Sequence, residues 1–258
     1  MRSECVVGDD ANRTFAGTIT DGATNKSSLV MNSAGRTQTL NGANTYTGNT
    51  TVTAGTLLLG TAGSIANSGT ISVASGATLN VSSVSGGWAL GSSQTLKGSG
   101  TVAGNATING NLQPGSSPGL LSFDSNLTLA PTANTTMEIN GSATRGTDFD
   151  GINVTSALVY DGTLTLAVGT TFGEGTYSFN LFDFGSQSSS FDAVTLSGNY
   201  TGSLSGPGNV WSLTSGVNTW TFTHSTGDLG LVVIPEPSTW VLLAGSLSTL
   251  MIFRRRRH

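Results

Sequence analysis

The sequence has little charge, few aromatic residues, six prolines and a single cysteine. Charged residues make up 9% of the 258 positions and aromatic residues 7%. One cysteine, Cys5, excludes an internal disulfide, and no spacing of cysteine and histidine suits a metal site. No stretch before residue 235 has the apolar period of a helix. These absences exclude an internal disulfide, a Cys/His metal site and helices outside the C-terminal tail.

Basic residues are scarce before the last few positions. Four of the ten basic residues are the consecutive arginines Arg254, Arg255, Arg256 and Arg257. Residues 1–234 therefore hold six basic residues against thirteen acidic ones, a net charge of −7. An acidic body with so few cations argues against nucleic acid as a partner, and against binding to anionic lipid headgroups.

The sequence is rich in glycine, with 36 residues, and in Thr, Ser and Asn. Between these turn formers, Val, Leu and Ile alternate with Thr and Ser, which is the pattern of half-buried strands. The clearest examples of this alternation are 70–73, 77–81, 105–109, 120–123, 126–129, 163–168 and 178–182. A short coil cannot bury a core alone, but stacked coils can. We therefore expect an all-β fold, a parallel β-helix (β-solenoid) with coils of roughly 20 residues. The alternative is an antiparallel β-sandwich, because strands 8–12 residues apart suit that fold as well.

One segment carries a specific resemblance. Residues 40–60 read Leu-Asn-Gly-Ala-Asn-Thr-Tyr-Thr-Gly-Asn-Thr-Thr-Val-Thr-Ala-Gly-Thr-Leu-Leu-Leu-Gly, and residues 114–119 read Pro-Gly-Ser-Ser-Pro-Gly. Both resemble the autotransporter-associated β-strand repeat, and the likeness extends from about 40 to 129. The resemblance implies a right-handed parallel β-helix of the kind found in autotransporter passengers. The translocator barrel that usually follows a passenger is replaced here by a different C-terminal segment.

That C-terminal segment has three parts in a fixed order. Pro235-Glu236-Pro237 is followed by an apolar run over 240–253 and then by the arginines at 254–257. Arginines that resist crossing a bilayer mark its cytoplasmic side, so the body is expected on the far side of the inner membrane. The apolar run is shorter than the ~20 residues of a stable spanning helix, which suits a temporary anchor.

This arrangement resembles the PEP-CTERM sorting signal of Gram-negative bacteria. The resemblance implies that Pro235, Glu236 and Pro237 are the sorting motif, that 240–253 forms a single hydrophobic helix in the inner membrane, and that an exosortase-type membrane protease is the partner. The arginines at 254–257 then act as the cytoplasmic stop. The two prolines keep the motif extended, which suits a protease groove. The alternative is an ordinary single-pass tail anchor.

We expect four segments along the chain. Residues 1–13 are disordered or mark a truncated N-terminus, because they lack the signal peptide that an exported protein needs. Residues 14–130 form the β-solenoid with the autotransporter-type repeat. Residues 131–233 form a C-terminal β-solenoid and β cap, where aromatic residues become more frequent. Residues 234–258 carry the sorting signal with its transmembrane segment.

Few residues suggest chemistry. Asp148 and Asp150, with Arg145 just before them, form the only dense acidic group and would share one face of a strand, as Ca²⁺ ligands must converge. A polar turn before the strand over 152–155 is the simpler explanation, and we favour it over a metal site. His224 has no Ser-His-Asp context. We expect no catalytic residue, no metal site and no cofactor.

Composition and resemblance together predict an exported structural protein of the cell surface or extracellular matrix, not an enzyme. It would reside transiently in the inner membrane and associate with exopolysaccharide through faces rich in Thr, Ser and Asn. One alternative is an adhesin-like carbohydrate-binding module, which requires aromatics exposed on one face, with Trp88, Trp211 and Trp220 as the candidates. The other is a β-helix enzyme that degrades polysaccharide, which requires convergent carboxylates.

Overall fold

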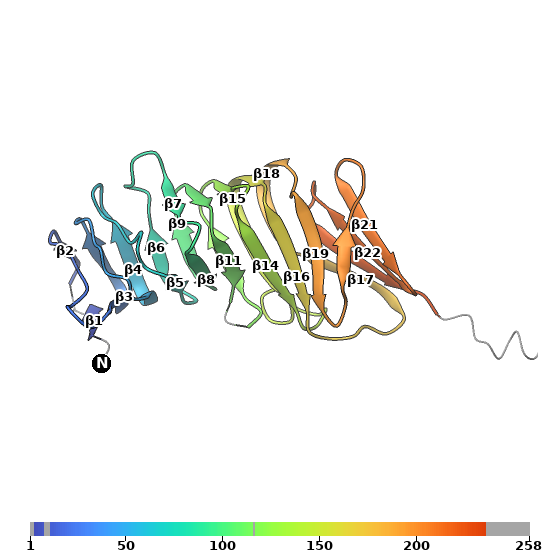
Figure 1. Ribbon diagram of the computed structural model, residues 1–258, viewed down its shortest axis with the longest axis horizontal. Coiled ribbons are helices and arrows are strands. Elements are labelled where there is room, and N and C mark those ends of the chain that lie inside the picture. The colour runs from blue at the N-terminus through green and yellow to red at the C-terminus, as the bar shows by residue number, and fades with distance from the viewer. Residues whose placement is uncertain (1–2, 8–10, 116, 236–258) are drawn as a thin grey trace, which may run out of the picture.

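The computed structural model describes residues 3–7, 11–115 and 117–235. Every regular element in these ranges is a β-strand, and 19 of the strands belong to one sheet. The strands stack side by side along the long axis of an elongated molecule (Figure 1). The all-β prediction is confirmed, and the mostly parallel pairing is consistent with a β-solenoid. The same pairing rules out the antiparallel sandwich as the architecture of the main sheet.

The large sheet consists of three stacks of strands, which we name A, B and C. Stack A is parallel throughout, and its inward positions stay in line from strand to strand. Its strands are β1 (Ser3–Val7), the first half of β3 (Ser27–Leu40), the first half of β4 (Thr50–Leu59), β5 (Thr70–Val73), β8 (Thr95–Gly98), β11 (Asn111–Pro114), β14 (Asn134–Ile139), β16 (Thr163–Val168) and β19 (Ala193–Gly198).

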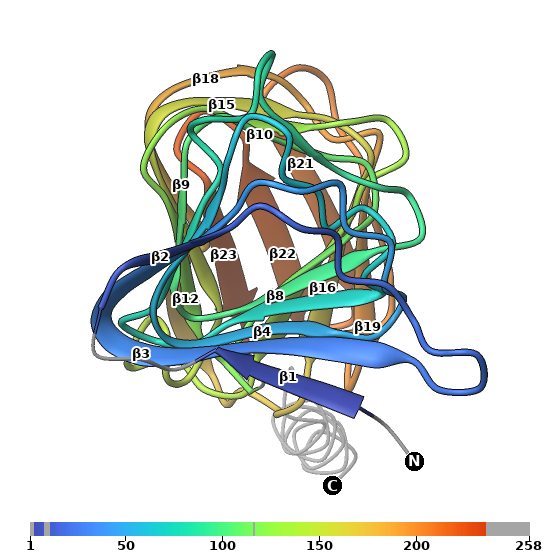
Figure 2. The same cartoon turned by 90° about the vertical axis from the view of Figure 1, so that its left-hand side faces the viewer.

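Stacks B and C complete the circuit around the interior, and both are parallel. Stack B holds β2 (Arg13–Phe15), the second halves of β3 and β4, β6 (Thr78–Asn80), β9 (Thr101–Ala103), β12 (Leu120–Phe123) and the first halves of β15 (Gly151–Tyr160) and β18 (Phe182–Ser189). Stack C holds β7 (Trp88–Leu90), β10 (Ala106–Ile108), β13 (Leu127–Leu129) and the second halves of β15 and β18. Figure 2, which looks along the stacks, shows the strands surrounding a common interior.

Alternation along each strand decides which side chains fill that interior. One inward row of stack A runs through Leu29, Thr50, Ile71, Leu96, Leu112, Thr135, Leu164 and Val194. All are buried. Parallel stacking places like side chains at one strand spacing, roughly 4.8 Å, so each coil buries the apolar face of the next. The core is therefore continuous through the stacks.

The interior also holds a hydroxyl chain. Tyr46 Oη lies 2.6 Å from Thr50 Oγ1, which donates to Ser68 Oγ at 2.9 Å. Ser68 Oγ donates in turn to the carbonyl of Gly48 at 2.9 Å. Because each hydroxyl of this chain has a partner, Thr50 is satisfied, whereas the buried hydroxyl of Thr135 in the same row has no partner among the described atoms.

One close backbone approach requires glycine. Gly98 has φ of +118°, and a Cβ built there would lie 2.0 Å from the carbonyl oxygen of Val73 on the neighbouring strand. Any side chain at this position would overlap the backbone of stack A, so glycine is the residue that allows β8 to pack on β5.

A second, antiparallel sheet covers the C-terminal end of the stacks (Figure 1). Its strand order is β17 (Gly175–Asn180), β23 (Asp228–Val233), β22 (Asn218–Thr223) and β21 (Val210–Ser215). The short strand β20 (Gly202–Leu204) pairs antiparallel with β19. Within residues 131–233, the parallel stacks thus continue to β19, and the antiparallel sheet lies beyond the last coil.

Aromatic side chains join the two sheets. Tyr160, Phe182 and Phe191 of the last coils pack against Phe222 of the antiparallel sheet, with ring centroids 6.5, 6.2 and 6.0 Å from it respectively. All four are at most 1% exposed. The aromatic residues that become frequent toward the C-terminus therefore close the apolar interior at that end of the stacks.

Two sequence predictions concern the ends of the chain. Residues 3–7, inside the segment 1–13, form β1 and pair with β3. No helix long and apolar enough to cross a membrane occurs among the described residues. The expected hydrophobic helix over 240–253 lies outside the residues that the structure describes.

Candidate functional site

Outward side chains form long polar rows on the stacks. The parallel register of stack B aligns Thr37, Thr56, Thr78, Thr101, Ser122, Asn153 and Asp183, which we call row B. Stack A aligns Thr70, Thr95, Asn111, Asn134 and Thr163, which we call row A. Each row repeats a hydroxyl, an amide or a carboxylate at every strand, roughly every 4.8 Å.

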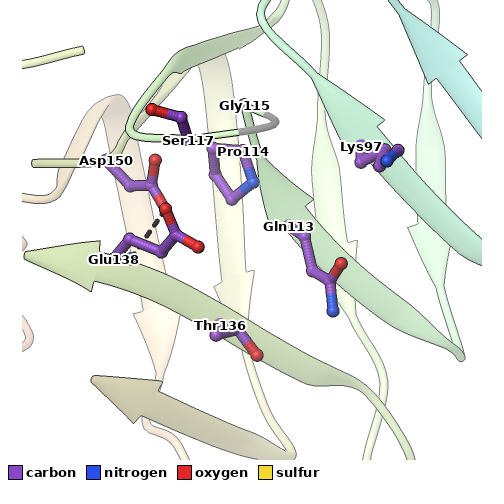
Figure 3. Close-up of a pocket in the computed structure, with 8 residues that line it drawn as sticks. All are labelled: Lys97, Gln113, Pro114, Gly115, Ser117, Thr136, Glu138 and Asp150. Carbon is purple, nitrogen blue, oxygen red and sulfur yellow. Dashed lines mark hydrogen bonds between the residues drawn. The ribbon is translucent and has the colours of Figure 1, made fainter. Parts of the chain in front are cut away.

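A pocket of about 180 Å³ interrupts the surface of stack A, and we call it the charged pocket. It is lined by Lys97, Gln113, Pro114, Gly115, Ser117, Thr136, Glu138 and Asp150. Figure 3 shows Glu138 and Asp150 together at one side of this pocket and Lys97 at the other. Strands β8, β11 and β14 supply its floor, and Gly115 and Ser117, which follow β11, supply its rim.

Asp150 is the most constrained group of the charged pocket. Its side chain is buried, and its two carboxylate oxygens accept the backbone N–H groups of Gly119 and Glu138, each at 2.7 Å. Burial raises the pKa of Asp150 to about 7; the two N–H groups lower it and the neighbouring Glu138 raises it further. The carboxyl therefore binds the 114–119 loop to β14 and exchanges a proton near neutrality.

The two aspartates of the predicted acidic group do not converge. Asp148 Oδ2 accepts the N–H groups of Ala143 and Thr144 at 3.1 and 2.8 Å, so it closes a turn. Asp150 instead faces the 114–119 loop. Among the described residues, no group of three or more His, Cys, Asp and Glu side chains is placed to hold a metal ion.

Arg145 supports the turn and does not complete a site with the aspartates. Its guanidinium donates to Asn153 Oδ1 at 2.6 Å and to the carbonyl of Ile152 at 2.8 Å. Burial lowers the pKa of Arg145, while Asp183 and Asp228 raise it. The arginine thus joins the loop before β15 to Asn153 of row B.

His224 lies inside the aromatic cluster. It is fully buried, with Nδ1 3.1 Å from the carbonyl of Asn209, and burial lowers its pKa. Its Nε2 and the hydroxyl of Tyr160 have no hydrogen-bond partner among the described atoms, and the two rings lie 5.8 Å apart. These neighbours are aromatic and apolar, so His224 acts as a core residue.

The three tryptophans do not form an exposed aromatic face. Trp88 is 6% exposed and Trp220 is fully buried. Trp211 is half-buried and packs against His224, with ring centroids 5.0 Å apart. These three residues therefore do not provide the exposed aromatic surface that an adhesin-like carbohydrate-binding module requires.

The sorting motif falls mostly outside the described part of the chain. Pro235 follows β23 and is exposed. Glu236 and Pro237 lie beyond the described residues, as do the arginines at 254–257. The sorting signal stays a prediction from the sequence.

Sequence reasoning missed Lys97 and Glu138 as pocket residues. They are 41 positions apart, and only the coil register brings them to one surface. The available signal was the Pro-Gly-Ser-Ser-Pro-Gly segment, because a loop rich in Gly and Pro marks a break in the regular surface.

A scan against protein-family models and a search of curated proteins found no match to the chain.

Proposed function

We propose that this chain is an exported structural protein of the cell surface or extracellular matrix that associates with exopolysaccharide. The observation that carries the proposal is the continuous polar row on each of two stacks, rows A and B. Hydroxyls and amides donate and accept hydrogen bonds, as sugar hydroxyls do. Many weak contacts at a regular spacing give avidity without a deep site.

The delivery route is part of the same proposal. The Pro235-Glu236-Pro237 motif, the apolar run over 240–253 and the arginines at 254–257 support sorting by an exosortase-type protease. The chain would reside in the inner membrane through 240–253 and then move to the surface. Exposure of Ile234 and Pro235, the two residues after β23, supports this route, because a protease needs an accessible segment next to the folded body.

We further propose that the solenoid is a right-handed parallel β-helix. A right-handed parallel β-helix is supported by the autotransporter-type repeat in 40–60 and by the strong preference of parallel crossover connections for the right hand. A rigid solenoid holds its outward rows in line, which is what a repeating polymer requires of a binding surface.

Row B provides the test. The double variant Thr78→Val and Thr101→Val removes two neighbouring hydroxyls while keeping side-chain shape. We expect weaker cosedimentation with the exopolysaccharide of the producing cells, and an unchanged circular dichroism spectrum. The matched control is Thr107→Val and Thr128→Val on stack C, where the neighbouring Ala89 and Val159 interrupt the polar row. Equal binding by the row B variant and the wild type would contradict the proposal.

Delivery has a separate test. Replacing Glu236 in the Pro-Glu-Pro motif by alanine should retain the chain in the inner membrane, as measured by fractionation and surface labelling. Unchanged delivery to the surface would favour an ordinary tail anchor.

A polysaccharide-degrading enzyme is the second candidate, and one observation favours it. Asp150, with a pKa near neutrality, shares the charged pocket with Glu138. A carboxylic acid beside a carboxylate is the pair that glycoside hydrolysis uses. Release of reducing ends from the same exopolysaccharide, lost in Glu138→Gln, would establish this candidate; no release would leave the structural role.

A further inference from the structure

A different pocket lies where the last parallel strand meets the antiparallel sheet, and we call it the seam pocket. It has a volume of about 270 Å³. Residues from the end of β19, from the turn after it and from the facing ends of β21 and β22 line it. The seam pocket shares no residue with the charged pocket or with rows A and B. Pockets between two packed units are common places for small-ligand binding.

The lining of the seam pocket is neutral and rich in hydrogen-bonding groups. Asn199 and Asn218 supply amides, and Thr201 and Ser215 supply hydroxyls. No Asp, Glu, Lys or Arg is among its described lining residues. Amides and hydroxyls both donate and accept, so the pocket matches a ligand that is itself neutral and carries several hydroxyl groups. An ionic ligand would lose its hydration without gaining a counter-charge.

Two aromatic residues, together with Leu196, form the remaining wall. Tyr200 packs edge to face against Trp220, with ring centroids 5.1 Å apart and planes at 72°. Tyr200 Oη accepts the N–H of Phe172 at 3.0 Å, so its own proton is available to donate. Aromatic faces pack on the C–H surfaces of a ring while nearby polar groups bind its hydroxyls.

Trp220 is the buried part of this aromatic wall. Its side chain is 0% exposed, and its Nε1–H is buried with no hydrogen-bond partner among the described atoms. A buried donor without an acceptor is unfavourable, and buried tryptophans usually find one. Because this N–H is buried, Trp220 serves the seam pocket by supporting the ring of Tyr200 and not by donating to a ligand.

We infer that the seam pocket binds one sugar residue of a neutral glycan. Its volume lies just below the roughly 300 Å³ at which pockets for drug-sized ligands begin, which fits a single ring and not an oligomer. The inference goes beyond the proposed function, because it assigns a defined site away from the polar rows. It shares with that function only the class of ligand.

Monosaccharide binding tests the inference. The probes are the methyl glycosides of glucose, galactose, mannose and N-acetylglucosamine, with glucuronate as the charged comparison. Saturation-transfer NMR and tryptophan fluorescence of the full chain report binding. We expect at least one neutral glycoside to bind saturably and glucuronate to bind at least tenfold more weakly.

Variants place the binding in the seam pocket. Trp220→Phe changes the ring on which Tyr200 packs, so we expect weaker binding of the glycoside. Asn218→Ala and Ser215→Ala should each weaken binding as well, and they keep the test valid if Trp220→Phe does not fold. The control is Ser212→Ala, on the same strand as Ser215 and outside the pocket, which should bind like the wild type.

Two results would overturn the inference: no saturable binding of any neutral glycoside, or binding that is unchanged in both Asn218→Ala and Ser215→Ala. Either result leaves the proposed function intact, because polymer cosedimentation through row B is measured separately. Conversely, unchanged polymer binding by the row B variant, together with glycoside binding in the seam pocket, would refute the row proposal alone.

Discussion

The buried carboxyl of Asp150 should make the folded state less stable as the pH rises through the acidic range. Its pKa is raised from 3.8 to about 7 by burial. Below 3.8 the folded and unfolded states both hold the proton, so the carboxyl contributes no difference. Between 3.8 and about 7 the unfolded chain releases the proton first, and stability falls with increasing pH.

The size of this effect follows from the shift. About three pKa units at roughly 1.4 kcal/mol each amount to about 4 kcal/mol of lost stability once the pH exceeds 7. Asp150→Asn removes the titration. It also loses one of the two acceptors that hold Gly119 and Glu138, which costs about 1–3 kcal/mol at every pH. The variant should therefore be less stable than the wild type at pH 4 and as stable or more stable at pH 8.

Urea unfolding of both proteins between pH 4 and pH 8, followed by far-ultraviolet circular dichroism, measures the difference. Taking the difference at each pH cancels the other titrating groups, such as Asp21, whose lowered pKa destabilises the fold toward acid. Glu138→Gln is the matched variant. It removes a charge that raises the pKa of Asp150, so the midpoint of the pH effect should move to lower pH. A difference between Asp150→Asn and wild type that stays constant over this range would refute the reasoning.

Three further predictions concern stability. Gly98→Ala should lower the free energy of unfolding in urea by more than about 2 kcal/mol, because its Cβ would overlap the backbone of Val73. Gly69→Ala, whose Cβ would meet nothing within 4 Å, should be neutral or slightly stabilising. Equal effects of the two variants would contradict the close approach at Gly98. Tyr160→Phe should not lower the melting temperature, because the lost hydroxyl has no hydrogen-bond partner among the described atoms. Tyr46→Phe should lower the free energy of unfolding by about 1 kcal/mol, because it loses the hydrogen bond to Thr50. A larger loss of stability in Tyr160→Phe than in Tyr46→Phe would refute this expectation. Burial lowers the pKa of His224 in the folded state, so the wild type loses stability as the pH falls below about 6.5. His224→Phe should remove this contribution. If the free energy of unfolding of the variant and the wild type fell equally toward acid pH, His224 would be excluded as the cause.

Local alternation predicted the parallel strands well. The expected stretches 70–73, 120–123 and 163–168 coincide with β5, β12 and β16. Their inward residues are fixed by the strand period, which is a local property of the sequence. The expected strand over 178–182 was wrong in its bounds, since the chain changes partner there. Antiparallel β17 ends at Asn180, parallel β18 begins at Phe182, and the N–H groups of Leu181 and Phe182 both donate to Gly227. Alternation is the same for both kinds of pairing, so it cannot reveal the change of partner.

The pockets could not be predicted because coil length varies. Aligned residues of row A are 16 positions apart from Thr95 to Asn111 but 29 apart from Asn134 to Thr163. A constant coil of roughly 20 residues would therefore place Lys97 and Glu138 in the wrong register. The seam pocket depends in addition on how the antiparallel sheet docks, which is set by Trp220 and Tyr200 in the folded state and not by any local pattern.

Unequal coils joined by equal strand spacings have a consequence for how such a chain can evolve. Extra residues at a corner leave the axial rise per coil untouched, because that rise is set by backbone pairing alone. Whole coils can be duplicated or deleted between matching strands, each changing the reach of the molecule by one strand spacing. The number of coils therefore sets the length of the stacked body, and loops at the corners can lengthen without changing it.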